Sequence, residues 1–89
     1  MARIPKPKFV EIEGEYYHVR FRDPGDFSEI RTPTWATDVA QEVCKDSKVR
    51  MGKRKGSEGW AVQSVLVPKE VGKAEARKRA EDIIEKIES

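Results

Sequence analysis

Apolar and polar residues alternate with a period of two near the start of the chain. Val10 and Ile12 alternate with glutamates over Phe9–Glu13, and Gly14 then permits a tight turn. Over residues 15–22 one side holds Tyr17, Val19 and Phe21, and the other side holds Tyr16, His18, Arg20 and Arg22. Two such closely spaced runs predict an antiparallel hairpin with one buried face.

The next segment has the residues of a tight turn. Pro24 presets φ at the second position of residues 23–26, and Gly25 can supply the positive φ that a type II turn needs at the third. Phe27 and Ile30 are then expected to pin a loop to the core.

A helix is predicted after this loop. Thr32 can cap it with its hydroxyl, Pro33 fits the first helical position, and the helix should end near Lys45 or Asp46. Its buried stripe would consist of Ala36, Val39, Ala40, Val43 and Cys44.

The second half of the chain repeats the strand, strand, helix order. Residues 48–52 predict a third strand, residues 52–59 a connecting loop, and residues 60–67 a fourth strand that Pro68 ends. The fourth strand is apolar on both sides, with Trp60, Val62 and Leu66 on one and Ala61, Val65 and Val67 on the other. Such a strand is typical of the centre of a sheet.

A last helix is expected to start near Gly72. Its buried stripe would consist of Ala76, Ala80, Ile83, Ile84 and Ile87. The element order ββαββα predicts a two-layer α+β domain, with a four-stranded, mostly antiparallel sheet and both helices on one face. This single domain would span residues 9–89, after a flexible basic arm at residues 1–8 that contains Pro5 and Pro7.

Positive charge is concentrated in two places. Of the 18 Lys and Arg residues, five lie in residues 48–55 and three (Arg3, Lys6, Lys8) in residues 1–8, and the remaining ten are outnumbered by 16 Asp and Glu residues, which leaves a net −6. Segregated charge of this kind indicates a polyanionic partner, foremost nucleic acid. Lys53, Arg54 and Lys55 would form the tip of a hairpin loop that contacts phosphates, with Lys48 and Arg50 on its stem. The alternative is a solvated loop that keeps a sheet edge soluble.

A second surface is predicted on the outer side of the second strand. Tyr16, Arg20 and Arg22 could stack bases and neutralise phosphates if the helices cover the other side. The alternative is cross-strand pairing of the two arginines with Glu11 and Glu13, which would neutralise them.

Other functional classes find little support in the sequence. One cysteine and one histidine cannot form a closed zinc site, and no acid–base pair of recognisable spacing is present, so neither metal, cofactor nor catalysis is predicted. His18 is expected at the surface, and Cys44 as a small buried hydrophobe. Carboxylates near residues 23–29 match no calcium loop. The chain lacks a long apolar run and a secretory signal, so we expect a cytoplasmic protein without membrane association.

Two stretches carry a resemblance to known sequences. Residues 21–27 continuing into residues 30–36, and residues 60–67, resemble short uncharacterised archaeal proteins, some of them linked to viral or plasmid genes. This resemblance implies no activity. It agrees with a chain that has no Asn and only two Gln residues among many Glu, Lys and Arg, a composition in the direction of thermophile proteins.

The sequence therefore favours a non-catalytic, largely sequence-independent nucleic-acid-binding module. The alternative is a protein-interaction module without a nucleic-acid role, either a homodimer or an adaptor that adds a strand to its sheet.

Overall fold

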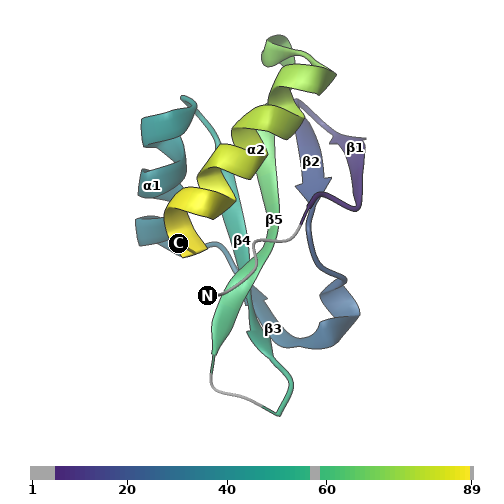
Figure 1. Ribbon diagram of the computed structural model, residues 1–89, viewed down its shortest axis with the longest axis vertical. Coiled ribbons are helices and arrows are strands. Elements are labelled where there is room, and N and C mark those ends of the chain that lie inside the picture. Colours follow the sequence, from purple (N-terminus) through teal and green to yellow (C-terminus); the bar gives the residue numbers. More distant parts are fainter. Residues whose placement is uncertain (1–5, 57–58, 89) are drawn as a thin grey trace.

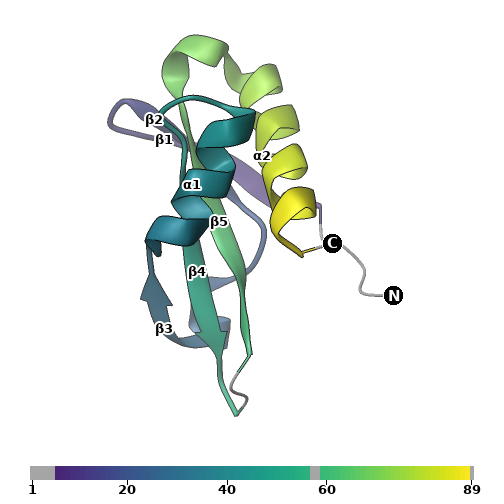
Figure 2. The same cartoon turned by 90° about the vertical axis from the view of Figure 1, so that its left-hand side faces the viewer.

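The computed structural model describes residues 6–56 and 59–88 of the chain. They form one antiparallel sheet with two helices on one of its faces (Figure 1, Figure 2). Its five strands lie in the order β1-β2-β5-β4-β3, so β5 is central. The elements are β1 (Phe9–Glu13), β2 (Tyr16–Arg20), β3 (Phe27–Arg31), α1 (Thr34–Val43), β4 (Lys48–Arg54), β5 (Trp60–Pro68) and α2 (Lys73–Glu88), with 3₁₀ helices η1 (Pro24–Asp26) and η2 (Lys69–Val71). The predicted α+β class is confirmed.

The predicted four-stranded sheet and the ββαββα order are wrong, because Phe27–Arg31 forms an edge strand and not a loop. The order is βββαββα. Phe27 and Ile30 are three residues apart, a spacing that places side chains on opposite faces of a regular strand. A β-bulge after Phe27 adds one residue, so both side chains fall on the same face.

Apolar side chains fill the space between the sheet and the helices. The buried cluster consists of Val19, Phe21, Ala36, Ala40, Val49, Met51, Val62, Val65, Val67, Ala76, Ala80, Ile83 and Ile84. Ile83 and Ile84 of α2 are fully buried, and each burial stabilises the fold by about 1.5–3 kcal/mol relative to an exposed side chain. The predicted stripe of α2 therefore faces the core, and so does that of α1 except for Val39, which is half-buried outside the cluster.

The two sides of β5 differ from the prediction. A bulge at Gln63 interrupts the pairing of β5 with β4. Val62 consequently faces the helices together with Val65, whereas Leu66 faces away from them. We refer to the side of the sheet away from α1 and α2 as the helix-distal face.

Two local predictions are corrected. Residues 24–26 form η1 and not a type II turn, because the Asp23 side chain accepts a hydrogen bond from the Gly25 N–H at 2.9 Å and φ of Gly25 is not positive. At the start of α1 the N-cap residue is Pro33, with no side-chain cap, so Thr32 lies outside the helix.

The β4–β5 hairpin extends past the helices at one end of the molecule (Figure 1, Figure 2). The strands stay paired as far as Lys53 and Trp60, and the Arg54 N–H donates to the Gly59 carbonyl at 3.0 Å. Lys53 and Arg54 therefore belong to a strand and not to the predicted loop, and Lys55 follows in the turn. The molecule measures 38 × 23 × 22 Å.

Candidate functional site

The basic stretch at residues 48–55 runs along β4, and the alternation of the strand divides it. Lys48 and Arg50 point to the helix-distal face, because Val49 between them is buried against the helices. Residues 53–55 lie at the projecting end of the hairpin. The five predicted cations therefore form two groups and not one continuous patch.

Carboxylates pair with two of the arginines on the helix-distal face. Arg20 lies 3.5 Å from Glu11, and Arg50 lies 3.3 Å from Glu13. The first contact is the cross-strand pairing that competed with nucleic-acid binding in the sequence interpretation. These pairs neutralise much of the charge that the predicted second surface would offer to phosphates.

Tyr16 and Lys48 meet on the same face from opposite sides of β5. The Lys48 ammonium nitrogen lies 5.4 Å from the centre of the Tyr16 ring, within cation–π range. Lys48 is exposed and Tyr16 is half-buried. The structure thus brings these two predicted residues together, but it turns the cation toward an aromatic ring of its own chain.

His18 is buried on this face, with 2% of its surface exposed, and not at the surface as predicted. Its Nδ1 lies 2.7 Å from a carboxylate oxygen of Glu13. Glu13 on β1 and its partner Arg50 on β4 are three strand spacings apart, about 14 Å in a flat sheet. Their extended side chains therefore reach over the intervening strands and shield the imidazole.

The charges around His18 have definite effects on titration. Burial lowers the pKa of His18, and so does the charge of Arg50, while Glu13 opposes both. The Arg50 guanidinium also lowers the pKa of Glu13. The cluster therefore favours a neutral imidazole beside an ionised carboxylate.

The Arg22 side chain does not lie on the helix-distal face, which corrects its predicted position there. Its guanidinium donates to both carboxylate oxygens of Glu88, at 2.8 and 3.0 Å, and to the Val62 carbonyl at 2.7 Å. Glu88 also accepts from the Val62 N–H at 2.8 Å. Burial alone would raise the pKa of Glu88, but these hydrogen bonds bring it below its ordinary value. Arg22 holds the C-terminal end of α2 against the sheet.

The three cations at the hairpin end form no direct ion pair among the described residues, although the charge of Arg54 acts on Glu88 and helps to lower its pKa. Arg54 and Lys55 are exposed, and Lys53 is half-buried. Among the residues that the structure describes, no carboxylate lies within ion-pair distance of any of these three side chains. In this respect they differ from Arg20, Arg22 and Arg50, each of which has a carboxylate partner.

Two exposed tryptophans lie beside this hairpin end, and sequence reasoning missed their proximity. Trp35, in the first turn of α1, is 55% exposed, and Trp60, which begins β5, is 42% exposed. They line two adjoining open clefts of about 250 and 480 Å³ that share Met51 as a floor. We call this the tryptophan groove and define it by Arg31, Trp35, Met51, Arg54 and Trp60. The available signal was the position of Trp35 outside the apolar stripe of its helix.

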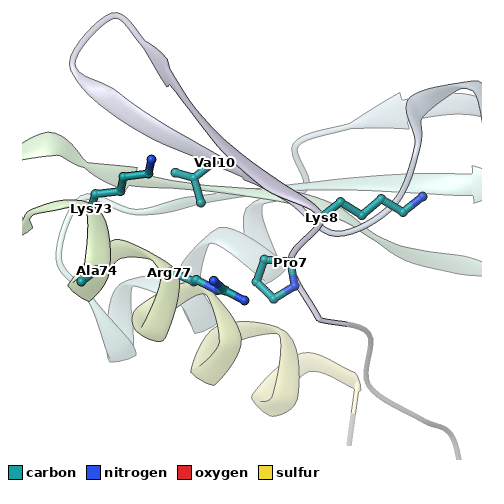
Figure 3. Close-up of a pocket in the computed structure, with 6 residues that line it drawn as sticks. All are labelled: Pro7, Lys8, Val10, Lys73, Ala74 and Arg77. Atoms are coloured by element: carbon teal, nitrogen blue, oxygen red, sulfur yellow. The ribbon is translucent and has the colours of Figure 1, made fainter.

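A larger open groove of about 690 Å³ lies between the start of β1 and α2 (Figure 3). Its lining residues are Pro7, Lys8, Val10, Lys73, Ala74 and Arg77. The Lys8 side chain points away from α2 (Figure 3), and Arg77 lies 3.6 Å from Glu81 on its own helix. Lys8 donates its backbone N–H to the Arg20 carbonyl at 2.7 Å, whereas Arg3 of the predicted arm lies outside the described residues. This groove contains none of the predicted hairpin residues.

The described part of the chain contains no group of three or more His, Cys, Asp or Glu side chains placed to hold a metal ion. Cys44 is half-buried against the core, where it has the role of an apolar side chain.

Within residues 6–56 and 59–88, neither of the two helices is long and apolar enough to cross a bilayer. Comparison with protein-family models, curated proteins and solved structures finds no match.

Proposed function

We propose that this protein is a non-catalytic nucleic-acid-binding module that contacts the phosphate backbone with the end of its β4–β5 hairpin. The observation that carries this proposal is the set of three cations, Lys53, Arg54 and Lys55, that lies on a projecting hairpin without ion pairs among the described residues. Outside the two basic segments the chain is acidic, so it repels phosphates elsewhere. The nucleic acid should therefore be oriented toward the hairpin.

Binding of this kind depends on salt and little on sequence. Lysine and arginine contacts to phosphates release counterions and carry no base information. The helix-distal face contributes less, because Arg20 and Arg50 already pair with glutamates there.

The proposal is tested by fluorescence anisotropy with labelled oligonucleotides of several sequences at about 50 and about 200 mM salt. The hairpin variant Lys53→Ala/Arg54→Ala/Lys55→Ala should bind more weakly to every sequence. The slope of log affinity against log salt should fall by about 2–3 units, because three phosphate contacts are lost.

A matched control removes the same charge elsewhere. Lys45, Lys69 and Lys78 are exposed, lie outside the hairpin and have no ion pair among the described residues. The variant Lys45→Ala/Lys69→Ala/Lys78→Ala should retain most of the salt slope. Equal losses in both variants would mean that only net charge matters, and an unchanged affinity of the hairpin variant would remove the hairpin from the interface.

A second candidate function is protein interaction by strand addition. β1 and β3 are the edge strands of the sheet, and each exposes an isoleucine, Ile12 at 65% and Ile30 at 39%. Exposed edge strands with apolar side chains favour pairing with another chain. Light scattering that finds a salt-insensitive dimer without nucleic-acid affinity would favour this function, and Ile30→Lys compared with Ile12→Lys would identify the edge involved.

A further inference from the structure

We propose that the tryptophan groove binds unpaired bases, so that the preferred ligand is single-stranded nucleic acid. This inference rests on the proposed function, because the same strand would continue from the hairpin end into the groove. Trp35 and Trp60 line a common cleft and both expose much of their surface. Exposed indole rings that share an open cleft are suited to base stacking, which accepts any base because each has a π face.

The charges around the groove explain why a nucleic acid fits better than an apolar peptide. The guanidinium of Arg31 lies 5.9 Å from the centre of the Trp60 ring. Arg54 lines the larger cleft, and Lys53 is the cross-strand partner of Trp60. Aromatic rings flanked by cations provide stacking and phosphate contacts together.

Two carboxylates near the groove offset part of this charge and leave the hairpin cations as its main source. Glu29 pairs with Arg31, and Glu88, which lines the larger cleft, pairs with Arg22. Arg31 therefore adds little net charge, and Glu88 also interacts electrostatically with Arg54, whereas Lys53, Arg54 and Lys55 have no direct ion pair among the described residues. The groove is open to solvent, as a passing strand requires.

The expected preference is for single strands over duplexes. In a duplex the base faces are covered by neighbouring base pairs, so only the phosphates remain for the hairpin to contact. A single strand adds base stacking, worth about 1–3 kcal/mol per base, which corresponds to about 5- to 150-fold in affinity.

Tryptophan fluorescence tests this inference directly, because Trp35 and Trp60 are the only two tryptophans of the chain. The full chain is titrated with oligothymidylate, with an abasic oligomer of the same length and with a duplex. We expect quenching by oligothymidylate alone, while anisotropy shows that all three ligands bind in a salt-dependent manner.

Two variants separate stacking from folding. Trp35→Ala removes a largely exposed ring, and Trp60→Leu keeps an apolar side chain at the start of β5. Each should weaken oligothymidylate binding by about 5-fold or more and leave abasic-oligomer binding unchanged, with circular dichroism confirming the fold. Trp35→Phe should restore part of the affinity, because a phenyl ring also stacks.

The outcomes distinguish this inference from the proposed function. If all ligands bind through the hairpin cations but tryptophan emission and variant affinities do not change, the stacking site is wrong and the hairpin interface stands. If no nucleic acid binds, both the stacking site and the hairpin interface are wrong. If emission shifts with protein concentration alone and both variants abolish a dimer, the groove is a contact between copies of this chain and the inference is overturned.

Discussion

Gly52 is the residue at which a single methyl group should matter most. It lies beneath the ring of Phe27, and a Cβ at this position would lie 2.3 Å from Cγ of that ring. Because Phe27 is buried, it has little room to move away. Gly52→Ala should therefore lower the free energy of unfolding by about 1–3 kcal/mol, measured by urea denaturation.

Gly25→Ala is the matched control for this prediction. Its nearest neighbour would be Oδ1 of the exposed Asp23 at 3.3 Å, an atom that can shift. We expect a change below about 1 kcal/mol. Equal effects of the two substitutions would show that the Phe27 ring does not occupy the position described.

His18 should make the fold sensitive to pH. Its pKa in the folded protein lies below the ordinary value of 6.5, so the unfolded chain binds this proton more readily. The contribution of His18 to the free energy of unfolding is therefore fully present above about pH 6.5 and is lost as the pH falls toward the pKa of the folded protein. The free energy of unfolding should therefore decrease below pH 6.5, and His18→Gln should remove that decrease.

Glu13 and Glu88 affect the free energy of unfolding in a separate, more acidic pH range. The pKa values of Glu13 and Glu88 are below their ordinary value of 4.5, so their contributions are present above that pH and are lost only in more acidic solution. The two windows can be measured independently by denaturation at several pH values. A wild-type protein that gains stability between pH 7 and pH 6 would contradict the assignment for His18.

The directions of single side chains were the hardest feature to predict from the sequence. Arg22 lies two residues after Arg20, and a period of two therefore places both side chains on the same side of a strand. In the structure β2 ends at Arg20, and both Phe21 and Arg22 donate their N–H groups to the Gln63 carbonyl. This irregularity redirects the side chain to α2, and nothing in the local pattern signals it.

At the level of elements, the contact between Arg22 and Glu88 fixes α2 to the sheet. Arg22→Met keeps the aliphatic stem but removes the hydrogen bonds to Glu88 and to the Val62 carbonyl. We expect a loss of about 1.5–3 kcal/mol in the free energy of unfolding, because a charged and half-buried partner is left behind.

Arg77→Met is the control for this clamp, since the pair of Arg77 with Glu81 is exposed on the surface of α2 and should be worth less than about 1 kcal/mol. Nucleic-acid affinity should be unchanged in folded Arg22→Met. A loss of affinity as large as that of the hairpin variant would return Arg22 to the interface.

The elements themselves were largely predictable where periodicity is regular. The stripe of α2 and most of that of α1 follow from the spacing of apolar residues, and the central position of β5 follows from apolar residues on both of its sides. β3 could not be found this way, because its bulge breaks the alternation between Phe27 and Ile30. The bulge at Gln63 breaks the alternation in the same way, so the pattern assigned Val62 to the wrong side of β5.

For the whole molecule, composition located the positive charge but not its arrangement. The pattern of β4 separates Lys48 and Arg50 from the hairpin end, and glutamates far away in the sequence pair with the arginines of the helix-distal face. The tryptophan groove joins the start of α1 to the start of β5, a proximity that only the folded chain reveals.

The most direct test locates bound nucleic acid on the protein by amide chemical-shift mapping of the full chain with oligothymidylate. We expect the largest shifts at residues 53–55, at Trp60 and at the first turn of α1, with the Trp35 and Trp60 indole N–H signals among them. Largest shifts on the helix-distal face, around Tyr16 and Lys48, or no shifts at all, would contradict binding at the hairpin end.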